Sequence, residues 1–406
     1  MRWRTQRGPG FLALILSLLL CGPAGSQAEN VESKVDMKLW GRAKFDVHFD
    51  TGRQLSNVDF MNYMVSEDDE ELNFMPRDTR FGFSAATTKG DWTHKAVFEI
   101  DFYGGQAGNN LLPRMRLGYA DMAHSSGFSL RAGQDWIPIA QQNPPTLDFG
   151  VLSWAGNLWW RVPQVTARYK LENGVELLAG AMKHRIRDNL PVDQEELLPW
   201  MMGRVAYTGF LDGKGLVAVG AGVRPVTIPF TAFDADTTAV DIDFAPFLVA
   251  GELSLPIGDQ LSVKAEAYMG RGLGEEFVHY GFEYNPYHPE DEAADEGRAI
   301  ASMGGFASLT FRPAKKTTLN AGFGMDDPDD DDMKVSEGAL LSVPYYRNTV
   351  VFGNVQQKLS ANLGVGFELI HFITEHAKSA AAKEEDDIET EEIAGQRVTL
   401  SMFYKF

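Results

Sequence analysis

Basic side chains recur at alternate positions along several segments of the chain, and this spacing suits the recognition of small anions. Arg114 and Arg116 stand two residues apart, and Arg168 and Lys170 repeat that spacing. Alternate residues of a β-strand lie on one face, so such pairs would line a common surface. An arginine side chain presents a rigid fork of donors that matches a carboxylate or a phosphate. The candidate residues for contact with solutes are Arg42, Arg80, Lys95, Arg114, Arg116, Arg131, Arg168, Lys170 and Arg204.

Groups that would support catalysis or metal binding are not gathered in the sequence. The 8 histidines are scattered without metal-ligand spacing, and no serine lies in a Gly-x-Ser-x-Gly motif. The single cysteine, Cys21, excludes a disulfide framework. A formal charge of −19 is unfavourable for binding nucleic acid, because phosphates need a basic face. We therefore expect no enzyme, no metal site, no cofactor and no nucleic-acid partner.

The N-terminal segment predicts export from the cytoplasm. Three arginines within the first seven residues precede the apolar run Phe11–Cys21, and Ser26-Gln27-Ala28 offers small residues for cleavage. This order is typical of a secretory signal peptide. Acylation of Cys21, as in a lipoprotein, is an alternative, although a bulky leucine precedes that residue. We expect residues 1–28 to be removed and residues 29–406 to form one domain with a formal charge of −22.

The segments that carry the basic residues alternate in polarity with a period of two. From Val35 to Asp50, apolar residues occupy one parity and mostly charged residues the other, which predicts a strand with one apolar and one polar face. This segment is far longer than the ~5–6 residues of an ordinary strand. The same alternation predicts about sixteen strands and no amphipathic helix. The predicted strands lie near 35–50, 80–87, 92–102, 114–119, 128–135, 164–171, 175–182, 200–208, 216–223, 240–255, 261–269, 299–312, 317–325, 346–355, 359–372 and 397–406.

The connections between these strands alternate in length. Outer-membrane barrels have short periplasmic turns and long extracellular loops, whereas a soluble sandwich has no reason to sort its connections in this way. The short turns lie near 89–91, 124–127, 172–174, 211–215, 256–260 and 313–316. The long links lie near 51–76, 104–110, 136–159, 184–199, 224–239, 271–298, 326–345 and 373–396.

The end of the chain and the physics of the bilayer agree with this pattern. Apolar residues occupy alternate positions from Val398 to the terminal Phe406, as in the C-terminal signal of outer-membrane proteins. Backbone groups in hydrocarbon need partners, so a membrane sheet must close on itself. We therefore predict an all-β fold, a transmembrane antiparallel β-barrel of about 16 strands in the outer membrane of a Gram-negative bacterium. Its partners would include the lipid bilayer and lipopolysaccharide.

The polar parity then predicts a water-filled, mildly basic lumen. A lumen wall rich in arginine and lysine lowers the barrier for negative solutes. The function expected is passive diffusion of small hydrophilic solutes, anionic or neutral, with a mild preference for anions. The arginines could instead pair with lumen carboxylates and only stabilise the wall, and the sequence leaves both possibilities open. Most acids lie in the long links, and the run Asp326–Asp332 predicts a solvated loop rather than an EF-hand Ca²⁺ site.

The long link 136–159 is the expected constriction of this lumen. Unlike the acidic links, it is aromatic and rich in proline, which suits a loop that folds inward. An external loop packed on a neighbouring subunit is the alternative. The candidate constriction residues are Gln134, Trp136, Gln141, Gln142 and Asp148.

Several motifs resemble the DcaP-like branch of Gram-negative porins. They are Arg80-Phe81-Gly82-Phe83, Phe98–Gly104, Gly133-Gln134-Asp135-Trp136, Pro145–Gly150 and Pro163-Gln164-Val165. The resemblance covers roughly residues 80–183, and the rest of the chain is similar in architecture only. It implies a homotrimeric barrel for small anions such as dicarboxylates. It also implies that Gln134 and Trp136 lie where a strand enters the constriction loop, with Asp148 further along.

Two other functions remain open at this stage. A structural or adhesive barrel would use the acidic loops as its binding surface. A barrel-rim hydrolase would need a nucleophile, a histidine and an Asn or Asp grouped on one rim.

Overall fold

The computed structural model describes residues 35–55, 60–105, 111–184, 198–230, 240–274, 276–278, 284–285, 298–334, 345–377 and 390–406. The chain divides into residues 1–35 and residues 36–406, and the second unit contains all the strands. The predicted signal peptide at 1–28 lies outside the described residues and stays a prediction. Over the described ranges, no helix has the length and apolar character needed to cross a membrane.

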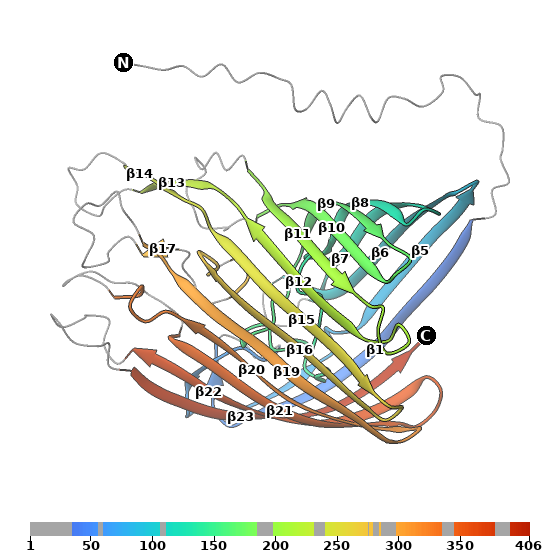
Figure 1. The fold of residues 1–406 in the computed structure, drawn as a ribbon. Coiled ribbons are helices and arrows are strands. Elements are labelled where there is room, and N and C mark those ends of the chain that lie inside the picture. Colours follow the sequence, from blue (N-terminus) through green and yellow to red (C-terminus); the bar gives the residue numbers. More distant parts are fainter. Residues whose placement is uncertain are drawn as a thin grey trace, which may run out of the picture. The chain divides into compact units, whose positions relative to one another are not determined.

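Sixteen strands form one closed antiparallel barrel, as the sequence predicts, when the interrupted second strand is counted once (Figure 1). Each strand pairs with its neighbour in the chain, and the first strand, β1 (Asp36–Asp50), also pairs with the last, β23 (Thr390–Lys405). The second strand of the barrel is interrupted and consists of β4 (Glu71–Met75) and β5 (Arg80–Lys89), which pair with different parts of β1. The other strands of the barrel are β6 (Trp92–Gly104), β7 (Leu112–His124), β8 (Phe128–Trp136), β9 (Arg161–Lys170), β10 (Val175–Met182), β11 (Trp200–Tyr207), β12 (Leu216–Val223), β15 (Phe247–Ile257), β16 (Leu261–Arg271), β19 (Ala301–Ala314), β20 (Thr317–Pro328), β21 (Arg347–Lys358) and β22 (Leu363–Ala377).

The barrel is polar inside and apolar outside. Along β1, Lys44, Asp46 and His48 are buried, whereas Phe45 and Phe49 are exposed. Large exposed apolar side chains follow the same alternation around the rest of the barrel, for example Met201 and Val205 on β11. This arrangement confirms the predicted parity, because only a hydrocarbon surrounding makes an apolar outer face favourable.

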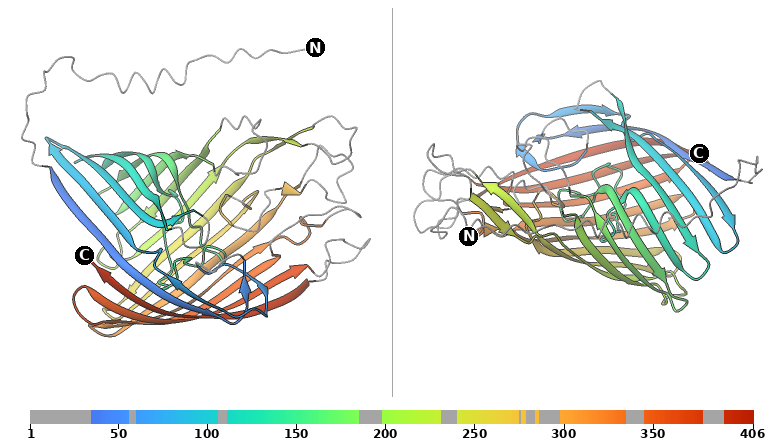
Figure 2. Two further views of the ribbon diagram at one scale, coloured as in Figure 1. Left: turned by 180° about the vertical axis from the view of Figure 1, so that it is seen from behind. Right: turned by 90° about the horizontal axis from the view of Figure 1, so that it is seen from above.

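Connection length also follows the prediction. All seven hairpin turns lie at the barrel end that holds the C-terminus, and the strand ends joined by the long links lie at the opposite end (Figures 1 and 2). Two of these turns, Gly90 and Gly174, place glycine at φ 59° and 88°, a backbone region that other residues adopt only with strain. Six of the seven turns have four residues or fewer and the turn between β11 and β12 has eight, lengths that suffice because the paired strands are antiparallel neighbours.

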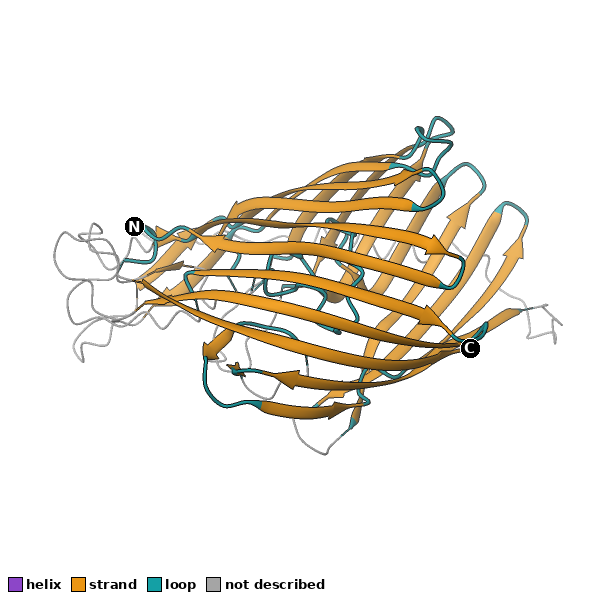
Figure 3. Cartoon of the chain, turned by 90° about the horizontal axis from the view of Figure 1, so that it is seen from below, coloured by secondary structure: helices purple, strands orange, loops and turns teal. Residues whose placement is uncertain are grey.

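Some predicted boundaries are wrong. The strand expected at 240–255 is two strands, β14 (Val240–Phe244) and β15, and β14 pairs with β13 (Val226–Phe230) in a separate two-stranded sheet. β22 and β23 extend into the link expected at 373–396. Two further short pairs lie outside the barrel sheet: β2 (Arg53–Gln54) with β3 (Met64–Ser66), and β17 (Tyr284–Asn285) with β18 (Arg298–Ala299). Figure 3 shows that the described part of the chain consists of strands and loops.

A β-bulge in β7 overturns one predicted face. Strict alternation over the predicted strand 114–119 places Met115, Leu117 and Tyr119 together on the outer face. The pairing of β7 with β6 departs from it: Glu99 opposes Leu117, but the next residue of β6, Ile100, opposes Met115. Arg116 is therefore an extra residue of β7. An extra residue in one strand reverses the side-chain alternation beyond it. Tyr119 therefore shares the inner face with Arg116.

Candidate pore and constriction

The link between β8 and β9 lies inside the barrel. It leaves β8 after Trp136, returns at Arg161, and buries Ile139 and Leu152 completely. Its apolar side chains pack with inward residues such as Trp200 and Leu248. Backbone inside a barrel still needs hydrogen-bond partners, and the wall provides them.

Wall carboxylates accept hydrogen bonds from the loop backbone. Glu368 on β22 accepts the N–H groups of Leu147 and Asp148, each at 2.7 Å, so one carboxylate holds two successive residues. Three other carboxyl groups each accept a backbone N–H of the loop. Glu252 accepts that of Gln141 at 2.9 Å, Glu266 that of Leu158 at 2.9 Å, and Asp326 that of Gly156 at 2.8 Å. Five backbone N–H groups of the loop thus find acceptors on four wall carboxyl groups, so this part of the wall fixes the loop.

Asp326 corrects a sequence expectation. It belongs to β20 and is buried, and it also accepts the hydroxyl of Tyr268 at 2.6 Å. The acidic run 326–332 therefore does not begin as a solvated loop, because its first member is part of the barrel interior.

Asp148 ties the loop to β23, the strand next to β22. Its carboxylate accepts Arg397 on β23 at 2.7 Å and the N–H groups of Met61 and Gly150 at 2.9 and 2.7 Å. Arg397 also donates to Asp50 at 2.8 and 3.0 Å. Burial raises the pKa of Asp148, but the Arg397 charge and the backbone hydrogen bonds outweigh it and leave the pKa below its ordinary value. Asp148 is thus an anchor of the loop.

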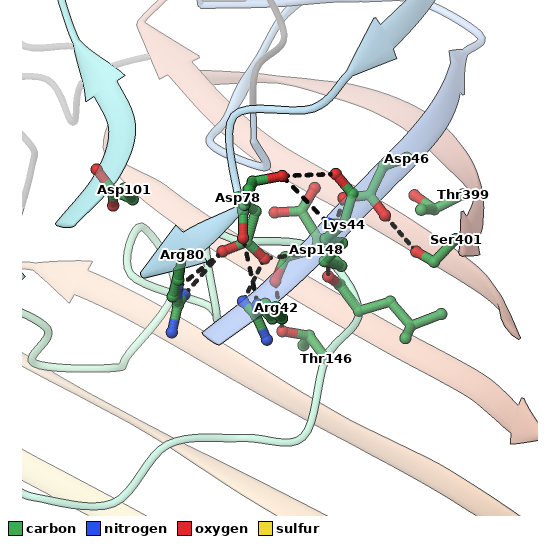
Figure 4. Close-up of polar contacts among 12 residues, drawn as sticks. Arg42, Lys44, Asp46, Asp78, Arg80, Asp101, Thr146, Asp148, Thr399 and Ser401 are labelled. Atoms are coloured by element: carbon green, nitrogen blue, oxygen red, sulfur yellow. Dashed lines mark hydrogen bonds and ion pairs between the residues drawn. The ribbon is translucent and has the colours of Figure 1, made fainter. Parts of the chain in front are cut away.

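A group of cations on β1 and β5 lies next to the loop, where Lys44 Nζ donates to the carbonyl of Leu147 at 2.7 Å. Asp78, between β4 and β5, lies among Arg42, Lys44 and Arg80 and forms ion pairs with all three, at 3.1 Å to Lys44 and 2.9 Å to Arg80 (Figure 4). Lys44 also pairs with Asp46 at 2.6 Å. Three cations against two carboxylates leave this group with an excess of positive charge. Asp78 was not predicted, because nothing in the local pattern distinguishes a residue in a strand break from one in an external loop.

The predicted arginines of β7, β8, β9 and β11 all have carboxylate partners. On β7, Arg114 pairs with Asp101 at 2.8 Å, and Arg116 pairs with Glu99 at 2.6 Å. The remaining pairs are Arg131 with Asp121 and Asp135 at 2.6 and 2.5 Å, Arg168 with Glu176 at 3.5 Å, and Arg204 with Glu252 at 2.6 Å. The structure therefore shows the wall-pairing alternative for these five arginines.

Arg161 differs from these arginines and was missed by the sequence prediction. Its guanidinium lies over the rings of Trp136 and Trp159, 4.7 and 4.8 Å from their centroids. It forms no ion pair within the described part of the chain, and its buried Nη1 atom has no hydrogen-bond partner there. Cation–π contacts stabilise it by only about 0.5–2 kcal/mol. The sequence prediction missed Arg161 because this residue lies between the predicted link 136–159 and the predicted strand 164–171.

Two cavities flank the loop. One, of about 230 Å³, is lined by five cations, Arg42, Lys44, Arg80, Arg116 and Lys405, and by the carboxylates of Asp78 and Asp148. The other, of about 260 Å³, is lined by Arg131, Arg168 and Gln141 among others. Trp136 and Asn143 line both, so they stand at the boundary between the two.

The other predicted site residues are placed as follows. Lys95 and Lys170 are exposed, and Gln142 is half-buried. Gln134 is a correction: strand alternation places it on the face of β8 opposite Arg131 and Asp135, and its amide donates to backbone carbonyls of β7. It therefore does not line the lumen.

Comparisons with known proteins agree with this geometry. No protein-family model matches the sequence, and no curated protein matches it. Among solved structures, the outer membrane channel DcaP of Acinetobacter baumannii superposes with a TM-score of 0.73 at 18% identity, over 92% of this chain and 97% of that one. The chain has the porin fold. The resemblance to DcaP-like porins expected from the sequence is confirmed at the level of the fold.

Other porins share this fold at lower similarity. An anion-selective porin from Comamonas acidovorans has a TM-score of 0.59 at 13% identity, covering 92% of this chain and 100% of that one. The loop-deleted OmpT of Vibrio cholerae has a TM-score of 0.56 at 14% identity, covering 92% and 99%. The porin fold spans a bacterial outer membrane as a closed β-barrel.

Proposed function

We propose that this chain is a passive outer-membrane porin whose constriction, formed by the loop 136–159 and the facing wall, favours small anions, including dicarboxylates. The observation that carries the anion preference is Arg161, a cation between two indoles without a carboxylate partner among the described residues. A charge that the wall leaves uncompensated attracts mobile counter-ions from the lumen.

The wider charge balance supports this proposal. Five cations and two carboxylates line the first cavity, and Asp148 is already occupied by Arg397. A solute with two carboxylates can contact two guanidinium forks, such as those of Arg42 and Arg80. Glu252, Glu266, Asp326 and Glu368 accept hydrogen bonds from the loop backbone, so their oxygens are turned toward the loop.

The direct test is solute flux into proteoliposomes. We expect a four-carbon dicarboxylate to enter faster than its neutral diamide and faster than a diamine of similar size. Arg161→Gln should reduce the advantage of the dicarboxylate severalfold, whereas the matched charge removal Lys214→Gln, on an exposed lysine in the turn between β11 and β12, should leave it unchanged. Equal rates for the three solutes would contradict the anion preference.

We also propose a homotrimer, on the strength of the porin fold alone. Native mass spectrometry in detergent should record three copies of the chain. A monomer under conditions that preserve the barrel would contradict this part of the proposal.

A further inference from the structure

The inner charge array depends on the bulge in β7. On one side of the bulge, Arg114 faces the lumen and pairs with Asp101. On the other side, Asp121 faces the lumen and pairs with Arg131, whose guanidinium also lies 4.1 Å from the ring of Tyr119. Without the extra residue, one of these two segments would turn its side chains to the outer face. Both halves of β7 contribute to the pore wall only because the bulge is present.

The bulge separates β7 from β8 at the same point. Backbone pairing between these strands runs from Ala123 opposite Ser129 to Gly118 opposite Gln134 and stops there. Beyond this point the side chain of Gln134 replaces the backbone: its Nε2 donates to the carbonyls of Met115 at 2.7 Å and Arg116 at 3.2 Å. These are the carbonyls of the bulged residue and of the residue before it.

Gln134 lies on the outer face of the sheet, where such a contact matters most. Its neighbour in the sequence, Asp135, points inward to Arg131. On the same face, the exposed Met115 lies against Gly118, the residue that pairs with Gln134. A carbonyl without a partner in hydrocarbon is costly, so a bulge in a membrane strand needs a donor that the regular ladder no longer supplies. A polar glutamine among apolar residues has its explanation in that need.

We propose that Gln134 is a positioning residue that locks the β7 bulge and thereby sets the direction of Arg116 and Asp121 in the lumen. The orientation of Arg116 is then shared between its inner contacts, Glu99 and Asp101, and an outer hydrogen bond to its own carbonyl. The link from this bulge to ion preference rests on the proposed porin function, whereas the bulge itself can be examined without it.

The test combines Gln134→Leu with a cysteine at Asp121. Asp121→Cys should react with a membrane-impermeant thiol reagent in the parent barrel, because the residue faces water. In the Gln134→Leu background the rate should fall by about tenfold or more, since a slipped strand turns position 121 to hydrocarbon, where the reagent is excluded. The control is Gln357→Leu, which removes another glutamine of the barrel wall, one on β21 that is hydrogen-bonded to Thr317 of β20 and makes no contact with the β7 bulge. An unchanged rate in the Gln134→Leu background would overturn the proposal.

A second variant keeps the proposal falsifiable if Gln134→Leu fails to fold. Gln134→Glu has the same shape, but its carboxylate cannot donate a hydrogen bond at neutral pH and regains a donor when protonated. We expect its reversal potential to differ from that of the parent at pH 7 and to approach the parent value at pH 4. A match with the parent at both values would refute the lock. The sign of the parent's reversal potential tests the proposed anion preference separately.

Discussion

Arg397→Met tests how the loop is held in the barrel. Arg397 is fully buried and bridges Asp50 and Asp148, both only 1% exposed. Methionine fills a similar volume without the charge, so the substitution leaves two buried carboxylates without their cation. Breaking a buried ion pair from one side costs about 3–5 kcal/mol. We therefore expect the free energy of unfolding to fall by about that amount.

The assay is equilibrium unfolding in urea of the barrel folded into detergent micelles, followed by tryptophan fluorescence. The matched control is Arg347→Met, because Arg347 also bridges two carboxylates, Asp327 and Glu375, but at the surface, with its side chain 42% exposed. Surface ion pairs contribute about 0–1 kcal/mol. A loss for Arg397→Met no larger than that for Arg347→Met would refute the reasoning.

Three further predictions concern charge and the constriction. Because the pKa of Asp148 is below its ordinary value, its stabilising contribution is complete above about pH 4 and declines as pH falls further; unfolding at pH 3 and pH 6 should show this loss in the parent and not in Asp148→Asn. Asp78→Asn should move the reversal potential further toward anions and lower the free energy of unfolding by about 3 kcal/mol, since Arg42, Lys44 and Arg80 lose their shared partner. Trp136→Ala should raise single-channel conductance, because it removes a side chain at the boundary of both cavities; an unchanged conductance would place the constriction elsewhere.

Local alternation was sufficient to predict most of the barrel. The inward positions of Lys44, Asp46 and His48 follow from a period of two, and this period is a property of the backbone that does not depend on distant contacts. The sorting of short and long connections followed from the same reasoning. A single inserted residue leaves the period almost unchanged on either side, so the bulge at Arg116 and the break at Asp78 were not visible in the sequence.

The candidate site was predictable only in part, for a related reason. Residue types indicated arginines on the inner face, but which of them keep a free charge depends on register across strands. Arg131 meets Asp121 because β7 and β8 pair at that position, and Arg161 meets only aromatic rings among the described residues. The resemblance to DcaP-like porins placed Gln134 at the entry to the constriction, whereas its hydrogen bonds to β7 assign it to the bulge.

The most direct test of an anion-favouring constriction is the reversal potential of the purified protein in a planar bilayer under a tenfold KCl gradient. Low and high total salt should both be measured, because the acidic loops act through a field that salt screens beyond about 10 Å at 0.1 M. We expect a potential of the sign given by chloride permeating faster than potassium, retained at high salt. A potential of the opposite sign at high salt would contradict the account.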